Sequence, residues 1–209
     1  HGMGKSSQLG WGITVGAAMA RMPQLIRVLQ NRSVEGISVV TLLGETSAYL
    51  TSVLYHRSLN YPFHMYGECA AFASQNVVLL LLCAKFTPRI RKPLLFLLTL
   101  TTLAVAYVQL RLQRFKRQLE YAQMANTAGC QLARLPQIVA NVRAGHTGEL
   151  SAAPWALNAL GSALRLSTSK DTVLRAGFGA SVLVNAIVVA QVLQSPAKHK
   201  HKHHHHHHH

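Results

Sequence analysis

The chain contains one four-residue pattern twice, and this duplication limits the folds that it can adopt. Arg21-Met22-Pro23-Gln24 returns 113 positions later as Arg134-Leu135-Pro136-Gln137. The same offset also pairs Gly16 with Gly129, Ala20 with Ala133, and Ile37-Ser38 with Leu150-Ser151. A similarity at one fixed spacing predicts that the fold is built from two copies of one unit.

Seven mainly apolar segments predict an all-α membrane protein with seven transmembrane helices. A bilayer core of ~30 Å needs about 20 helical residues at ~1.5 Å each. The segments are Leu9–Leu29, Val39–Tyr55, Met65–Ala84, Leu94–Leu110, Leu119–Asn141, Ala152–Thr168 and Thr172–Gln194. Several contain polar residues, so a soluble helical bundle is the alternative. Val77–Cys83 and Pro93–Ala106 argue against that alternative, because they are apolar on all sides, as a lipid-facing helix must be.

The duplication also predicts how the spans are arranged. Three helices reverse the direction of the chain, so two equivalent copies face the same way only if a further span separates them. The result is a 3+1+3 arrangement, two parallel three-helix bundles joined by a linker helix. The predicted boundaries are 8–86 for the first repeat, 91–112 for the linker helix and 117–194 for the second repeat, with a vector scar and short N-terminal segment at 1–7 and a purification tag at 198–209.

The net charge of the chain limits the kinds of partner that we expect it to bind. It carries 21 basic residues against six acidic ones, a formal net charge of +15, and only three of the lysines belong to the tag. Such a balance suits an anionic membrane surface or an anionic ligand. Because the charges lie in short clusters between apolar stretches, we expect no nucleic-acid partner. The lysines and arginines of the loops favour neither membrane orientation.

The two prolines of the repeated pattern lie inside predicted helices. Proline removes one helical hydrogen bond, so Pro23 and Pro136 should each kink their span near its end. Gln24 and Gln137 are the expected partners for the freed backbone groups. One interpretation is a purely structural hinge, and the other is a pair of hinges about which the two halves rock, with the glutamine amides helping to gate a central site.

Arg21 and Arg134 stand two residues before these prolines. A guanidinium in the centre of a span costs ~2.5–3.5 kcal/mol on insertion scales, so it normally faces the bundle interior or extends to the lipid headgroups. If both arginines face inward, they are candidate phosphate ligands, since a guanidinium binds phosphate through paired hydrogen bonds.

Further intramembrane polar residues form a candidate polar core. Glu45 and Asn158 are separated by the same 113 positions and could meet across the axis as a binding pair. Gln75 and Asn76 lie in the third segment of the first copy and Asn185 in that of the second, where the asparagines could reach a sugar hydroxyl. The alternative is an interhelical hydrogen bond worth about 0.6 kcal/mol. The sequence contains no catalytic, metal-binding or cofactor-binding motif, so we expect neither an enzyme nor a cofactor.

The doubled Pro-Gln motif with seven predicted spans resembles the PQ-loop family. Within that family the chain is similar to the members needed for the use of dolichol-phosphate mannose. The residues that carry this similarity are Leu135-Pro136-Gln137, Gly145–Ala152, Ser33–Ser38, Tyr61-Pro62-Phe63, Tyr66-Gly67-Glu68, and Asn185 with Ala190-Gln191.

The resemblance implies a multi-pass endoplasmic-reticulum membrane protein with a lumenal N-terminus and a cytosolic C-terminus. It implies a role in the use of dolichol-phosphate mannose and glucose for N-glycosylation, O-mannosylation and GPI-anchor assembly, by binding or translocating the lipid-linked sugar. The expected partners are membrane lipids, dolichol-phosphate sugars and glycosyltransferases. Two alternatives stay open: a facilitator of small solutes such as sugars or amino acids, and a non-transporting chaperone or scaffold for glycosyltransferases.

Overall fold

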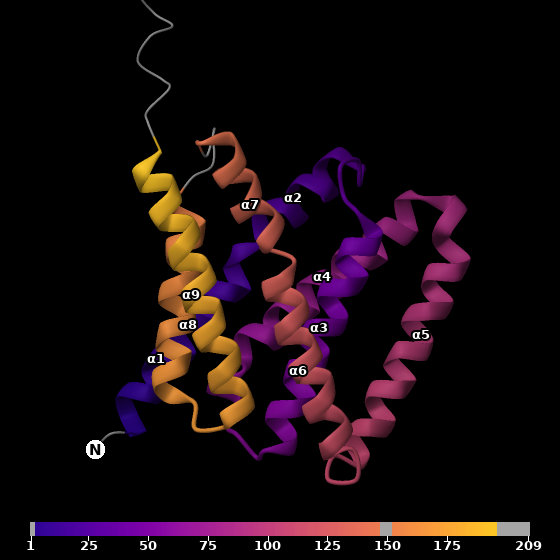
Figure 1. The fold of residues 1–209 in the computed structure, drawn as a ribbon. Helices are drawn as coiled ribbons and strands as arrows, with labels where there is room; N and C mark the ends of the chain where they lie inside the picture. The colour runs from indigo at the N-terminus through magenta and orange to yellow at the C-terminus, as the bar shows by residue number, and fades with distance from the viewer. Residues whose placement is uncertain (1–2, 147–151, 196–209) are drawn as a thin grey trace, which may run out of the picture. The chain divides into compact units, whose positions relative to one another are not determined.

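The computed structural model describes residues 3–146 and 152–195, and every regular element within these ranges is helical (Figure 1). The elements in chain order are α1 (Met3–Ala20), α2 (Met22–Asn31), α3 (Val39–Ser58), a 3₁₀ turn η1 (Phe63–Met65), α4 (Gly67–Phe86), α5 (Pro88–Leu110), α6 (Lys116–Leu132), α7 (Leu135–Ala144), α8 (Ala152–Thr168) and α9 (Thr172–Gln194). The predicted pairing of Leu150-Ser151 and the tag at 198–209 lie outside the described residues.

Five of the predicted spans are single helices, namely α3, α4, α5, α8 and α9. The limits of α8 and α9 agree with the prediction. The helix α5 begins at Pro88 rather than Leu94, because proline fits the first turn of a helix, where its missing N–H group would have no partner in any case.

The two spans that carry the Arg-x-Pro-Gln pattern are each broken into two helices. The expected kinks are therefore complete breaks, between α1 and α2 and between α6 and α7. Pro23 and Pro136 lie in the first turn of α2 and α7. These two helices have 10 residues each, about 15 Å at ~1.5 Å per residue, so neither crosses a bilayer by itself.

The chain forms two compact units, 1–126 and 127–209, and the boundary lies inside α6. In the first unit, α4 packs against α1, α3 and α5. Its core includes Val28, Leu42, Leu79, Leu80 and Cys83. In the second unit, α8 and α9 pack side by side and α7 contacts α9. The 3+1+3 arrangement and its repeat boundaries stay predictions.

Three of the described helices are long and apolar enough to cross a membrane: α4, α5 and α9. The apolar window of α5 is only 6% buried, and it exposes large side chains such as Phe96, Leu100 and Leu103. A helix that is apolar on its exposed surface belongs in lipid. The protein is therefore a membrane protein.

A close contact between threonine and glycine recurs in both units. Thr14 of α1 lies against Gly67 of α4, and Thr127 of α6 lies against Gly177 of α9. The threonines are 113 positions apart, but the glycines are 110 apart. The third helix of the second copy is therefore shifted by three residues relative to the simple sequence offset.

We predict that Gly67→Ala destabilises the protein by about 1–3 kcal/mol, the usual cost of overpacking. A Cβ atom at this position would collide with the Thr14 side chain. Gly44 of α3 is the control, because it has nothing within 4 Å of such an atom. Gly44→Ala should stabilise by about 0.5–1 kcal/mol. Thermal unfolding in detergent measures both, and Thr14→Ala should partly restore Gly67→Ala. A Gly67→Ala variant as stable as Gly44→Ala would contradict the contact.

Candidate functional site

Arg21 lies at the break between α1 and α2 and points into the first unit. Its Nη2 atom donates to Oε2 of Glu45 at 2.8 Å, and its Nη1 atom donates to Oδ1 of Asn76 at 2.6 Å. Asn76 in turn donates to the same Glu45 oxygen at 3.4 Å. The helix break, α3 and α4 each supply one member of this triad, so three elements meet at one charged group.

The triad is only partly shielded. Asn76 is fully buried, whereas the side chains of Arg21 and Glu45 are 22% and 36% exposed. The Arg21 guanidinium carbon also lies 6.0 Å from the centre of the Phe72 ring, which stacks on Tyr49 at 5.3 Å. Because Glu45 neutralises Arg21, a phosphate at this position would have to compete with a carboxylate already in place.

Gln75 forms hydrogen bonds with backbone carbonyl groups at the first helix break. Its amide nitrogen donates to the carbonyl oxygens of Ala17 (3.1 Å) and Ala18, in the last turn of α1. The expected partner for these freed groups was Gln24, and that expectation was wrong. The side chain of Gln24 is exposed on α2. No local sequence pattern indicates that a residue 57 or 58 positions away takes this role.

Arg134 lies at the second helix break, where its surroundings differ. Its Nη1 atom is 3.4 Å from the hydroxyl of Ser181 on α9. Ser162 of α8 donates to the same hydroxyl at 2.8 Å, and Asn185 donates to it at 3.1 Å. Within the described residues Arg134 has no carboxylate partner. We call Arg134, Ser162, Ser181 and Asn185 the Ser181 cluster.

The sequence did not single out Ser162 and Ser181. The one available signal was that Ser181 precedes Asn185 by one helical turn and therefore lies on the same face of α9. Asn158, the predicted partner of Glu45, is exposed on α8. It lies in the second unit and Glu45 in the first, so their predicted pairing stays a prediction.

The three-residue shift of the third helix changes which amides correspond. When Gly67 is matched to Gly177, the residue that corresponds to Asn185 is Gln75. Asn76 then has no asparagine at its corresponding position. Asn185 also donates to the backbone oxygen of Ser181 at 2.8 Å. In both amides the nitrogen donates hydrogen bonds. The buried oxygens, Oε1 of Gln75 and Oδ1 of Asn185, have no hydrogen-bond partner within the described structure. Each oxygen can accept a hydrogen bond from a hydroxyl group.

Gln137 does not bind the freed backbone either. It donates to Asn141 at 2.9 Å, and Asn141 donates to Gln191 of α9 at 2.8 Å. Gln191 then donates to the backbone oxygen of Ile138 at 3.3 Å. This chain ties α7 to α9. Whether the two breaks act as gating hinges stays a prediction.

The described residues contain no group of three or more histidines, cysteines or carboxylates that could hold a metal ion. The polar groups that the structure brings together are the guanidinium, carboxylate and amide groups of the triad and the guanidinium, hydroxyl and amide groups of the Ser181 cluster. They can bind anions and hydroxyl groups.

Comparisons with known proteins agree with the repeated architecture. A family model described as "PQ loop repeat" matches residues 6–65 and 119–169, one stretch around each helix break. The human (Homo sapiens) protein "Solute carrier family 66 member 3" is 25% identical over 188 residues, which cover 88% of this chain and 91% of the relative. No solved structure matches the chain.

We predict that Arg21 and Glu45 are energetically coupled. In a double-mutant cycle with Arg21→Gln and Glu45→Gln, the free energies of unfolding should deviate from additivity by about 0.5–3 kcal/mol, the range for residues in direct contact. Chemical unfolding in detergent gives these energies. The control pairs Arg21→Gln with Glu120→Gln, since Glu120 is an exposed carboxylate outside the triad. Additivity in both cycles would show that the ion pair is not formed.

Proposed function

Because the chain belongs to the PQ-loop repeat family, we propose that it is a non-enzymatic membrane protein that binds the phosphate-bearing head group of a dolichol-linked sugar. The observation that carries the proposal is the guanidinium of Arg134 in the Ser181 cluster, which has no carboxylate partner among the described residues. A cation without a carboxylate partner, in contact with a serine hydroxyl group, suits a phosphate. The lipid tail of the ligand would stay in the bilayer.

The Asn185 side chain adds a place for the sugar. Its oxygen is buried and unpartnered in the described structure, and a buried unpaired acceptor costs about 1–3 kcal/mol. A sugar hydroxyl would satisfy it. Phosphate at Arg134 and hydroxyl at Asn185 together match the two parts of a phospho-sugar head group.

The biological setting of the proposal rests on the resemblance of the sequence motifs. The protein would act in the endoplasmic-reticulum membrane as a seven-span protein, in which α1 with α2 and α6 with α7 each form one broken span. It would bind or translocate dolichol-phosphate mannose and glucose for N-glycosylation, O-mannosylation and GPI-anchor assembly. Glycosyltransferases that use these lipids are its proposed partners.

We predict that Arg134→Gln weakens binding of dolichol-phosphate mannose by about tenfold or more. A hydrogen bond to a charged group contributes about 1.5–3 kcal/mol, which corresponds to that factor. Binding can be measured by native mass spectrometry of the full chain in detergent. Arg143→Gln is the matched control, because it removes the same charge from an exposed position in the last turn of α7. Arg21→Gln should have a smaller effect, since Glu45 already occupies its guanidinium.

Two outcomes contradict the proposal. One is unchanged binding after Arg134→Gln. The other is an equal loss with Arg143→Gln, which would indicate a general attraction of the basic chain for anions rather than a site.

A second candidate function is facilitated movement of a small polar solute. The supporting observation is the triad of Arg21, Glu45 and Asn76, whose ion pair has no net charge and whose groups suit an uncharged or zwitterionic solute. The name of the human relative, a solute carrier, is consistent with it. Uptake of labelled mannose or amino acids into liposomes containing the protein, abolished by Glu45→Gln but not by Glu120→Gln, would favour this function over lipid handling.

A further inference from the structure

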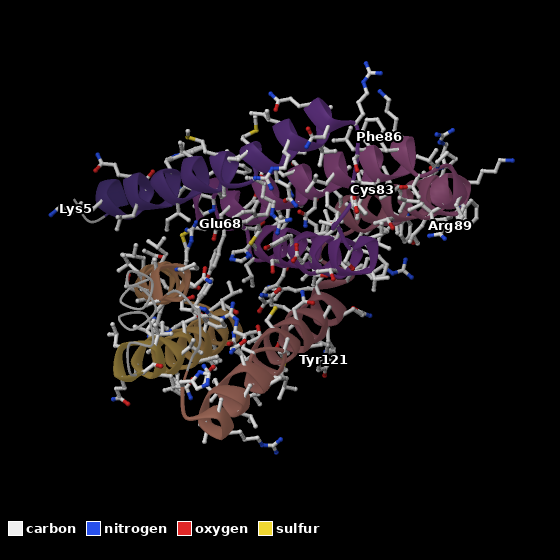
Figure 2. All side chains as sticks on the ribbon, turned by 90° about the horizontal axis from the view of Figure 1, so that it is seen from above. Lys5, Glu68, Cys83, Phe86, Arg89 and Tyr121 are labelled. Atoms are coloured by element: carbon white, nitrogen blue, oxygen red, sulfur yellow. The ribbon has the colours of Figure 1, made fainter. Side chains whose placement is uncertain are left out.

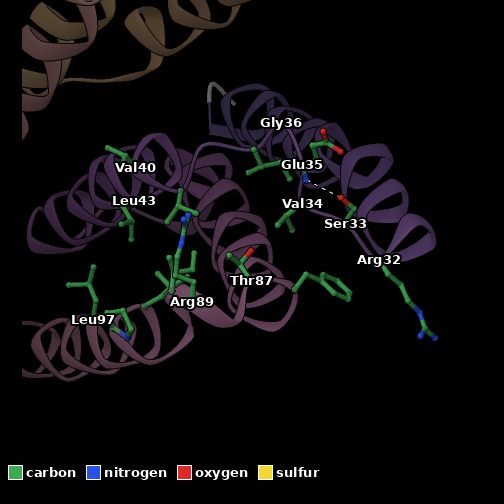
Figure 3. A pocket seen from close by; sticks show the side chains of 16 residues that line it. Arg32, Ser33, Val34, Glu35, Gly36, Val40, Leu43, Thr87, Arg89 and Leu97 are labelled. Carbon is green, nitrogen blue, oxygen red and sulfur yellow. Dashed lines mark hydrogen bonds between the residues drawn. The ribbon is translucent and has the colours of Figure 1, made fainter.

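A groove of about 750 Å³ lies in the first unit between the loop that joins α2 to α3, the adjoining part of α3, and the start of α5 (Figure 3). Ligand pockets have volumes of about 300–1,000 Å³. The walls of the groove are mainly apolar and include Val40, Leu43, Ile90 and Leu97. The groove contains none of the residues of the polar triad.

The groove extends along α5 for about the depth of one lipid leaflet. Arg89, Pro93 and Leu97 all line it, and they are spaced four residues apart, so they lie on one face of the helix. From Arg89 to Leu97 the helix rises about 12 Å at ~1.5 Å per residue. Half of a ~30 Å hydrocarbon core is about 15 Å. The groove therefore has a cationic end and an apolar wall of leaflet length.

Arg89 is the cation at that end. Figure 3 shows its side chain reaching across the groove toward α3, whereas the side chains of Arg32 and Glu35 point away. Viewed from above, Arg89 lies near the end of α4 that carries Phe86 (Figure 2). Within the described residues Arg89 has no carboxylate partner. The nearby Arg91 is already used, since it donates to the backbone oxygens of Ala84 (3.0 Å) and Lys85 (2.8 Å) at the end of α4.

Two hydroxyl groups lie among the lining residues. Ser33 accepts a hydrogen bond from the backbone of Glu35 at 3.2 Å, which leaves its own proton free to donate. Thr87 lies between α4 and α5 and also lines the groove. A phosphate held by Arg89 could accept a hydrogen bond from the Thr87 hydroxyl group, which lies two residues before it in the chain.

We propose that this groove binds an anionic glycerophospholipid of the surrounding bilayer. The head-group phosphate would lie at Arg89, and one acyl chain would lie along Val40, Leu43 and Leu97. Charge complementarity and position support this occupant: α5 exposes its apolar surface to lipid, and basic residues at the end of a membrane helix attract anionic lipids. The bound lipid would fill the space between α5 and α3 and brace the helix that follows the first three-helix group.

The test is a titration of the purified full chain with phosphatidic acid, followed by native mass spectrometry. Arg89→Gln should weaken binding about fivefold or more, as expected for one basic residue near an anionic lipid. Lys92→Gln is the matched control, because it removes a neighbouring exposed charge that does not line the groove, and its effect should be clearly smaller than that of Arg89→Gln.

A second pair of variants tests the apolar wall without changing charge. Val40→Trp should fill the groove and weaken binding to a similar extent, and it should fold normally because Val40 is 80% exposed. Leu110→Trp at the far end of α5, where the residue is 84% exposed, should have no effect. Arg89→Gln should leave the Arg134-dependent binding of dolichol-phosphate mannose unchanged, so a failure of this proposal is distinct from a failure of the proposed function.

Several results would overturn the proposal. Equal losses with Arg89→Gln and Lys92→Gln would indicate diffuse electrostatic attraction. Unchanged phosphatidic acid binding by the Val40→Trp variant would show that no acyl chain occupies the groove. Equal binding of phosphatidylcholine would show that the net charge of the lipid does not contribute to binding. Full competition by inorganic phosphate would show that the acyl chain does not contribute. Displacement of phosphatidic acid by an equal amount of polyprenyl phosphate would assign the groove to an isoprenoid lipid instead.

Discussion

A proline without an N–H group, two residues after an arginine, is the constraint on which each unit depends. The proline ends the first helix of its span and begins a second one, so carbonyl oxygens at the break lose their helical partners. In a membrane such groups must be satisfied by other parts of the protein. In the first unit Gln75 does so from α4, which fixes α4 against the end of α1. The same break turns Arg21 toward α3 and α4.

The two copies share this break but have diverged in charge. Position 45 holds a glutamate, and the position 113 residues later holds Asn158. An amide cannot neutralise a guanidinium, and Asn158 is exposed in any case. As a result, Arg21 is part of an ion pair, whereas Arg134 contacts only the Ser181 hydroxyl among the interactions that the structure describes. The replacement of the carboxylate at this position is therefore one of the differences between the closed triad around Arg21 and the Ser181 cluster around Arg134.

The helices were predictable because their signals are local. Runs of apolar residues predicted the start of α3 and both ends of α9, whereas α5 begins at Pro88 rather than at the predicted Leu94. The breaks at Pro23 and Pro136 also follow from the chemistry of one residue. The inward direction of Arg21 was one of two alternatives, and only the packing of three helices decides it.

The parts that sequence did not reveal depend on contacts between distant segments. The three-residue shift of the third helix follows from the packing of Thr127 on Gly177, so the match between Gln75 and Asn185 could not be found by a fixed offset. Ser181 is the centre of a hydrogen-bonded cluster because the packing of α8 on α9 brings Ser162 to it, and Asn185 lies one turn further along α9. Likewise, the groove at Arg89 requires the start of α5 to lie beside α3.

Under the proposed function, divergence between the copies leaves Arg134, and not Arg21, available to hold a phosphate. A cryo-electron-microscopy structure of the protein in a nanodisc with dolichol-phosphate mannose, enlarged by a bound antibody fragment, tests it most directly. We expect phosphate density within hydrogen-bonding distance of the Arg134 guanidinium, with Arg21 still paired to Glu45. Phosphate density at Arg21 with the Arg21–Glu45 pair broken would contradict it.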